Sequence, residues 1–398
     1  MFPVGSRMGR SSGTVPVSVL TTTDPVLRDS ALFGLLMDAP GVVAVRHEIH
    51  TDHLRRVVQD ATGVLEDVLV PLEHACLSCA VREDAVPTIA RLAGDGRWTQ
   101  VLLALPVSAE LLPAARALAA ETAPGGQLAH TRIATSLALV DLDTFEDDLL
   151  GEDTLTERGL ELTADDERSV GEALAAQVEQ ADLVVACGGH GSGSTSSSGM
   201  DADTAHATAS GLLDRLRGAG TRRVDGLHAL TAANLAAGRH SPSRAERRAH
   251  PLGAVVTEPG VVSGDRSWTL ELRSALPFHP ERLVERIEDL SAGRLRARGV
   301  FHVADRPGLA CLWDGAGGQL AVADLGPWSE VCAGTEPHTR IVVVGVADGA
   351  SAERVDADRQ QLLEAFQGAL CTPEEMSGGI ARLGREDHLA PWLGARSV

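Results

Sequence analysis

The chain contains no lysine and no tyrosine among its 398 residues, so every permanently basic side chain is an arginine. The missing lysine excludes the phosphate-binding lysine of a P-loop, a Schiff-base lysine and a lysine general base. Acidic residues number 55 against 35 basic ones, which gives a formal net charge of −20. Because a surface this acidic repels phosphate backbones, we expect no direct contact with nucleic acid.

The chain also has few cysteines and no long apolar run. Six cysteines in 398 residues do not make a disulfide scaffold, and only Cys76 and Cys79 lie close together in sequence. No run of 18 apolar residues is present, so we expect no membrane-spanning helix. Residues 1–14 lack the apolar segment of a signal peptide and are predicted to be a disordered tail. We therefore expect a cytoplasmic protein.

The first half of the chain alternates short apolar runs with helical spacing. Buried strands are predicted at 15–20, 42–49, 101–106, 132–140 and 181–187. Helices are predicted between them, at 26–37, 80–94, 108–121 and 166–180. This alternation predicts an α/β fold with a doubly wound, mostly parallel sheet over residues 15–237.

Two polar stretches and a differently patterned second half follow. Residues 188–211 are rich in Gly and Ser and are predicted to be a flexible loop, and 238–262 a linker. Several short strands with two helices predict a smaller α+β domain at 263–378. Residues 379–398 are predicted to be a C-terminal tail.

Three segments of the second half carry a family resemblance. They read LPFHPERL at 276–283, RLRARGVFHVADRP at 294–307 and LWDGAGGQLAVADLGPW at 312–328. Their order and spacing resemble the C-terminal domain of the CobW family, metal-handling P-loop GTPases. The layout from residue 15 onward is similar to the GTPase domain of that family. The resemblance implies a P-loop GTPase-like first domain.

The nucleotide motifs of that family are not kept. The segment at the P-loop reads TTTDPVLRDSA at 21–31 and contains no glycine. The residues of this eroded loop that we single out are Thr21, Asp24, Arg28 and Asp29. The two acids put negative charge where phosphates bind in the family, and arginine cannot replace a nest of backbone amides.

Two further motifs are lost with it. VSAEL at 107–111 stands where the resemblance predicts Glu-x-Thr-Gly, and CGGH at 187–190 where it predicts Asn-Lys-x-Asp. Three losses together predict that GTP does not bind and that the protein is not an enzyme. Any remaining activity would be that of a GTPase.

The metal signature is partly kept. The family has a Cys-x-Cys-Cys turn at the start of a helix, and this chain has HACLSCAVRED at 74–84, with Ser78 in the middle position. Two thiolates at this spacing suit tetrahedral zinc, and a helix start and Arg82 are expected to lower the pKa of both thiols. The resemblance also places Glu48 near the metal. The predicted zinc ligands are Cys76, Cys79, Glu48 and His74.

Other interpretations of this turn stay open. It is either a zinc site or a turn with two reduced thiols, and a thioredoxin-like redox role is a third interpretation. The remaining histidines have no metal-ligand spacing.

Three functions follow from these patterns. The motif at 74–84 resembles most closely the Mrf subfamily, which recruits a ribosome hibernation factor during zinc limitation. This implies a non-catalytic adaptor whose partners are that factor and, through it, the ribosome. The alternative is a GTP-dependent zinc metallochaperone of the CobW type. A third is a degenerate paralogue with another partner.

Overall fold

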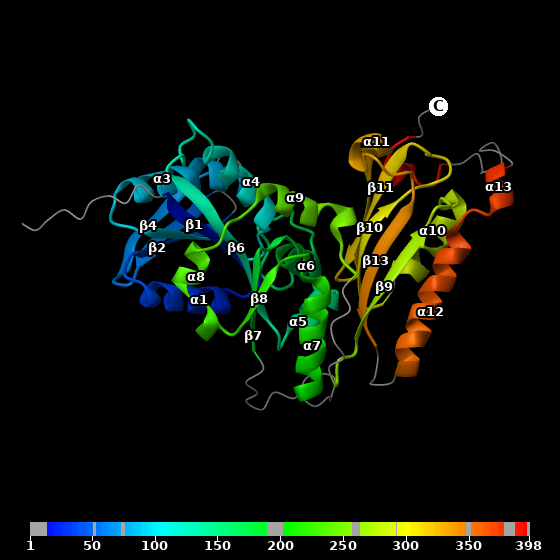
Figure 1. Ribbon diagram of the computed structural model, residues 1–398, viewed down its shortest axis with the longest axis horizontal. Helices are drawn as coiled ribbons and strands as arrows, with labels where there is room; N and C mark the ends of the chain where they lie inside the picture. The colour runs from blue at the N-terminus through cyan, green and yellow to red at the C-terminus, as the bar shows by residue number, and fades with distance from the viewer. Residues whose placement is uncertain are drawn as a thin grey trace, which may run out of the picture.

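The computed structural model describes residues 14–50, 53–72, 76–188, 202–256, 263–291, 293–347, 352–377 and 387–395. The chain forms two units side by side, each built on its own sheet (Figure 1). In these ranges no helix is both long and apolar enough to cross a lipid bilayer.

The first unit contains an eight-stranded sheet in the order β4-β3-β2-β5-β1-β6-β7-β8. Six of its strands are parallel: β1 (Val15–Thr21), β2 (Val42–Ile49), β5 (Gln100–Ala104), β6 (Thr131–Asp141), β7 (Leu183–Cys187) and β8 (Arg222–Asp225). Their apolar runs are explained by burial on both faces. In the centre, β1 pairs with β5 and places Val17 opposite Val101.

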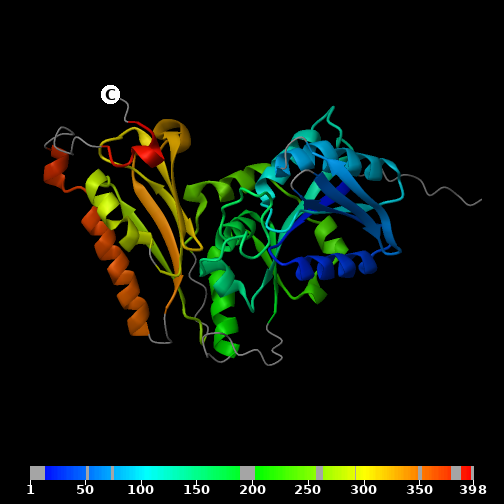
Figure 2. The same cartoon turned by 180° about the vertical axis from the view of Figure 1, so that it is seen from behind.

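Helices cover both faces of this sheet, as Figures 1 and 2 show. One face packs against α1 (Pro25–Asp38) and α8 (Ala232–Ala236). The other packs against α3 (Val86–Gly94), α4 (Leu111–Glu121), α5 (Phe145–Leu150), α6 (Val170–Gln180) and α7 (Ala202–Leu216). The predicted doubly wound architecture is therefore confirmed.

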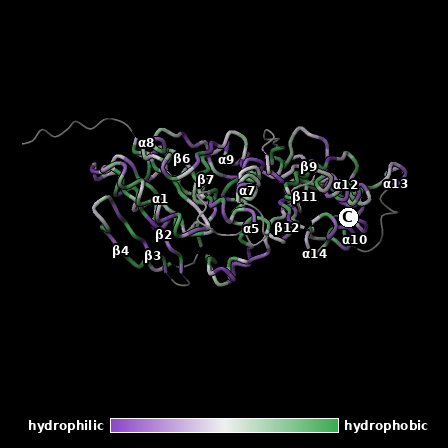
Figure 3. Tube along the Cα trace, turned by 90° about the horizontal axis from the view of Figure 1, so that it is seen from below, coloured by the Kyte–Doolittle hydropathy of each residue, from purple (hydrophilic) through white to green (hydrophobic). Residues whose placement is uncertain are grey.

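The open edge of the sheet is a hairpin that the sequence analysis did not predict. It consists of β3 (His53–Asp60) and β4 (Gly63–Pro71), which pair antiparallel. Figure 3 shows β4 at the outer side of the first unit. Four large apolar side chains of this edge strand are exposed: Val64, Leu65, Val68 and Leu69.

Two predicted loop regions contain helices. The prediction of a flexible loop over 188–211 is wrong from residue 202 onward, where α7 begins, and 189–201 lie outside the described residues. The predicted linker 238–262 contains α9 (Pro242–Ala249), which contacts α4 and α6. The reason is tertiary, because the Arg248 guanidinium is buried and pairs with Asp182 at 3.0 Å.

The second unit contains a five-stranded antiparallel sheet in the order β12-β11-β10-β13-β9. The strands are β9 (Ser267–Ser274), β10 (Leu295–Phe301), β11 (Leu309–Ala316), β12 (Gln319–Pro327) and β13 (Thr339–Val346). The helices α10 (Pro280–Ser291) and α12 (Ala352–Ala369) cover one face. Edge-to-face contacts join the rings of Phe278, Phe301, Trp313 and Phe366 in this core. The predicted small α+β unit is confirmed.

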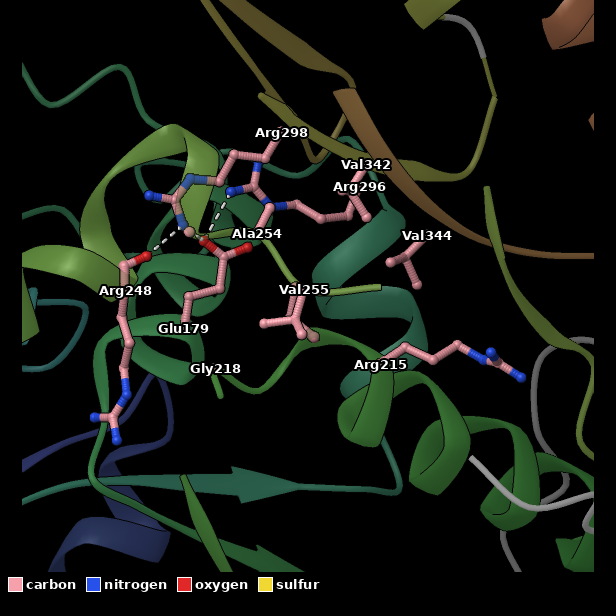
Figure 4. Close-up of a pocket in the computed structure, with 12 residues that line it drawn as sticks. Glu179, Arg215, Gly218, Arg248, Ala254, Val255, Arg296, Arg298, Val342 and Val344 are labelled. Atoms are coloured by element: carbon pink, nitrogen blue, oxygen red, sulfur yellow. Dashed lines mark hydrogen bonds and ion pairs between the residues drawn. The ribbon is translucent and has the colours of Figure 1, made fainter. Parts of the chain in front are cut away.

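The other face of this sheet packs on the first unit through a buried ion-pair cluster. Glu179 of α6 accepts hydrogen bonds from Arg296 at 2.8 and 3.0 Å and from Arg298 at 2.5 Å (Figure 4). Nearby, a Cβ on Gly171 would lie 2.8 Å from the Cα of Gly317. Only glycine fits so close an approach, so the backbones of the two units touch at this point.

Candidate functional site

The two neighbouring cysteines lie on a single turn. Cys76 has an extended backbone and caps the short helix α2 (Leu77–Ala80). Its sulfur accepts a hydrogen bond from the backbone N–H of Cys79 at 3.2 Å. Cys76 is exposed and Cys79 is partly buried. The turn thus holds the Cys76 sulfur against the backbone of Cys79, with Cys76 open to solvent.

A π-helix follows this turn directly. The segment η1 (Val81–Ala85) ends with the N–H of Val86 donating to the carbonyl of Val81, a wider turn than that of an α-helix. Pro87 explains the widening, because its ring has no N–H and clashes with the carbonyl four residues earlier. Single π-turns inside α-helices occur frequently at functional sites.

The π-helix is fixed to the sheet by Asp84. Its carboxylate lies 2.9 Å from Nε2 of His47 on β2 and accepts a hydrogen bond of 2.5 Å from Arg56 on β3. His47 is fully buried, and Arg56 also donates to the Thr88 hydroxyl. The sequence analysis missed this role. The signal was present, because Asp84 is the last residue of the quoted HACLSCAVRED motif.

The thiol of Cys79 does not have the electrostatics expected from its neighbours. A hydrogen bond with Cys76 and then burial raise its pKa, and these effects outweigh the Arg82 guanidinium 3.9 Å away, which lowers it. The prediction of a lowered pKa is therefore wrong for Cys79. A bound cation would favour the Cys79 thiolate instead.

The predicted acidic ligand is not beside the cysteines. Glu48 receives hydrogen bonds from Arg28 and Arg55, both at 3.3 Å, and lies 3.6 Å from Arg46. His74 lies outside the described residues. In the part of the chain that is described, no three His, Cys, Asp or Glu side chains form a group that could hold a metal. Among the described residues, the turn therefore presents two sulfur ligands and no further ligand beside them.

At the segment expected to have lost its phosphate loop, β1 runs into α1 through only three residues. Asp24 is the N-cap of α1, and its carboxylate accepts hydrogen bonds from the N–H groups of Val26 at 2.7 Å and Leu27 at 3.1 Å. Pro25 contributes no N–H. The donors that would face a phosphate at this helix start are therefore occupied by a side chain of the chain itself.

The other residues singled out in this loop are also tied to the protein. The Thr21 hydroxyl is buried and donates to the carbonyl of Ala109 at 2.5 Å. The buried Arg28 pairs with Asp29 and Glu48, at 3.1 and 3.3 Å. Asp29 also accepts from Arg46. Arg28 thus serves an ion-pair cluster on the β2 side of α1.

A cavity of about 330 Å³ adjoins the β1–α1 turn at the carboxyl ends of β1 and β6. Ligands of doubly wound folds usually bind at this edge. The titratable residues of its lining are Asp24, Asp141, Asp148 and Arg158. Burial raises the pKa of Asp141, and the carboxylates of Asp143 and Asp24 add to this. Burial also raises the pKa of Asp148. Three carboxylates against one guanidinium make this cavity unfavourable for a phosphate.

The segment at the second lost motif closes onto the same turn. Ser108 has a left-handed backbone, with φ of 70°, and is completely buried. Its N–H donates to the carbonyl of Thr22 at 3.0 Å, and its hydroxyl to Leu160 at 2.6 Å. Of the third segment, CGGH, only Cys187 and Gly188 are described.

Comparison with known proteins gives the following similarities. Residues 267–370 match the family described as the cobalamin synthesis protein CobW C-terminal domain. A protein named zinc chaperone from Mycobacterium tuberculosis is 28% identical over 316 residues, covering 76% of this chain and 72% of the relative. Zinc-regulated GTPase metalloprotein activator 1 of Dictyostelium discoideum is 25% identical over 294 residues, covering 70% and 58%.

Among solved structures, the crystal structure of the Zn(II)-bound YjiA GTPase from E. coli is 12% identical, with a TM-score of 0.34. The alignment covers 90% of this chain and 100% of that chain. The names of the sequence relatives support the zinc-metallochaperone alternative better than the hibernation-factor adaptor. The unit built from β9 to α12 therefore matches the CobW C-terminal domain, and the chain is similar to proteins named for zinc handling.

Proposed function

We propose that this protein binds zinc through Cys76 and Cys79 and passes it to a partner protein, without a GTPase cycle. The observation that carries the proposal is the preformed turn on which both sulfurs lie, with the Cys79 N–H fixed 3.2 Å from the sulfur of Cys76. The names of two sequence relatives, a zinc chaperone and a zinc-regulated GTPase metalloprotein activator, support zinc as the metal.

A site with only the two sulfur ligands that the described residues offer suits a protein that transfers its metal. Two thiolates supply half of a tetrahedral shell, and a partner or water can supply the other half. A closed four-ligand site would hold zinc more firmly and release it more slowly. The anchoring of the following π-helix by Asp84, His47 and Arg56 keeps the turn in place when the metal leaves.

The absence of a GTPase cycle is supported by the start of α1. Asp24 takes the backbone donors there, and the adjoining cavity has three carboxylates. A nucleotide would bring further negative charge to this place. We therefore propose that GTP does not bind and that zinc transfer depends on the partner.

The adaptor that recruits a ribosome hibernation factor is the second proposal. It also requires no nucleotide, and the net charge of −20 favours a basic protein partner. A partner captured from zinc-starved cells separates the two. A basic, ribosome-associated factor supports the adaptor, and a zinc enzyme supports the chaperone.

The direct test is zinc binding measured against a competing chelator. Wild type is expected to bind one zinc ion, and Cys76→Ser and Cys79→Ser to bind at least about tenfold more weakly, since each loses a ligand. Cys187→Ser is the matched control, because this half-buried cysteine lies on β7. Equal zinc affinity in all four proteins contradicts the proposal. A GTP titration with magnesium is expected to show no binding. Micromolar affinity for GTP would contradict the proposal that the protein works without a GTPase cycle.

A further inference from the structure

The cysteine turn has a second chemistry that zinc binding does not use. We propose that Cys76 and Cys79 form a reversible intramolecular disulfide, a modification that removes both sulfurs as metal ligands. Formation of the bond needs only the geometry of the turn, and its effect on zinc rests on the proposed function.

The two sulfurs are already close. The sulfur of Cys76 accepts a hydrogen bond from the backbone N–H of Cys79 at 3.2 Å, so it lies directly beside the residue that carries the second sulfur. A disulfide requires an S–S distance of about 2.05 Å and Cα atoms within about 7 Å. Residues three apart on one helical turn meet the second condition. Rotation of the two side chains is then enough to close the bond.

Exposure decides which thiol reacts first. Cys76 is exposed, so a small oxidant can reach its sulfur, whereas Cys79 is partly buried behind it. This is the arrangement of an attacking thiol with a resolving thiol next to it.

The other four cysteines are unsuited to the reaction. Cys311, Cys332 and Cys371 are buried, and Cys187 is half-buried. Burial raises the pKa of Cys187 and Cys371 to about 11 and that of Cys311 to about 12. Because burial limits the access of an oxidant to their sulfurs, we expect these four to remain reduced when the turn is oxidised.

The oxidant is a low-molecular-weight disulfide, such as oxidised glutathione. The Cys76 thiolate attacks one of its sulfurs, forms a mixed disulfide and releases the first glutathione as a thiolate. The Cys79 thiolate then attacks the Cys76 sulfur and releases the second. The protein loses two electrons and two protons, and the oxidant gains them as two thiols.

The bond has a chemical effect and a small mechanical one. The sulfurs of a disulfide carry no negative charge and do not replace thiolates as zinc ligands. The closed ring contains only four residues, so it restricts the unfolded chain very little. Oxidation is therefore expected to release zinc while the fold stays intact.

The test is equilibration of the full-length protein with graded ratios of reduced and oxidised glutathione. The reaction is quenched with acid, and free thiols are alkylated under denaturing conditions and counted by intact mass. The expected result is the loss of two alkylation sites of the six at oxidising ratios, reversed by reductant. Peptide mapping should assign the bond to Cys76 and Cys79. Six alkylated cysteines at every ratio, or a bond elsewhere, overturn the proposal.

Variants test the order of the steps. Cys79→Ser is expected to accumulate the mixed glutathione disulfide on Cys76, and Cys187→Ser to behave as wild type. A Cys79→Ser protein that gains no glutathione overturns the attack by Cys76. Zinc is expected to slow oxidation of wild type severalfold. If chelator competition shows no zinc binding and the two thiols still oxidise, only the proposed zinc function fails.

Discussion

The carboxylate of Asp24 lies 2.7 Å from the backbone nitrogen of Val26, within the first turn of α1. The Asp24 side chain thus occupies the N–H groups at the start of α1 that could otherwise bind a phosphate. The same hydrogen bond has two effects, because it stabilises the helix and occupies a donor that could bind a phosphate.

Replacement of Asp24 tests its role as a cap. Asp24→Ala is expected to lower the free energy of unfolding by about 1 kcal/mol, because two N–H groups lose their acceptor. Asp24→Asn keeps an acceptor oxygen and should retain most of the stability. Urea denaturation followed by circular dichroism measures both. Equal stability of wild type and Asp24→Ala would show that the cap contributes nothing.

The buried Glu179 is expected to contribute much more to the free energy of unfolding than the Asp24 cap does. Glu179→Gln removes the carboxylate that pairs with Arg298 and leaves Arg296 with Asp314 alone, and we expect a loss of about 3–5 kcal/mol. Glu246→Gln is the control, because Glu246 and Arg116 form an exposed pair worth at most about 1 kcal/mol. Similar losses of unfolding free energy in the two variants would show that the buried cluster contributes no more to stability than the exposed pair.

Asp182 is expected to make the protein less stable in acid than at neutral pH. Burial alone raises the pKa of this carboxyl, but hydrogen bonds from His240 and Ser136 outweigh it and lower the pKa to about 2. A lowered pKa in the folded state stabilises the protein above the ordinary value of 3.8, and this contribution is lost as the pH falls toward 2. Asp182→Asn is therefore expected to cost about 2 kcal/mol at pH 6. The cost should shrink between pH 4 and pH 2, and a cost that stays constant over this interval contradicts the assignment.

Asp141 is expected to change the stability with pH in the direction opposite to that of Asp182. Its raised pKa means that the folded state holds its proton more strongly than the unfolded state. Stability therefore falls as the pH rises from the unfolded-state pKa to the folded-state pKa. Asp141→Asn is expected to raise the melting temperature at pH 7 and to lose this advantage near pH 4. Asp165→Asn, at an exposed position, is the control and should leave both values unchanged.

The sequence predicted the central strands because their burial on both faces leaves a continuous apolar run. Leu102 and Leu103, for example, pack against opposite faces of the sheet. The β3–β4 hairpin was missed because charged residues interrupt its apolar residues in both strands, so neither strand has a continuous apolar run. The strand β8 (Arg222–Asp225) was missed because it is short and polar.

In the candidate site too, some residues could be placed from the sequence and one could not. Cys76 and Cys79 are local in sequence, so their spacing was enough to place them on one turn. Glu48 depends on tertiary structure, and three arginines from α1, β2 and β3 hold it. No local pattern distinguishes a carboxylate that binds metal from one that balances guanidinium groups.

The edge strand β4 has a consequence for handling the protein. Natural sheets often keep such an edge from pairing with another molecule by placing lysine on it, and this chain has none. The charged residues of β4 are Glu66 and Asp67, and arginines neutralise both. Valine and leucine side chains beside the unpaired edge of the backbone make β4 prone to intermolecular aggregation. We therefore expect association between molecules during purification and storage to begin at this strand.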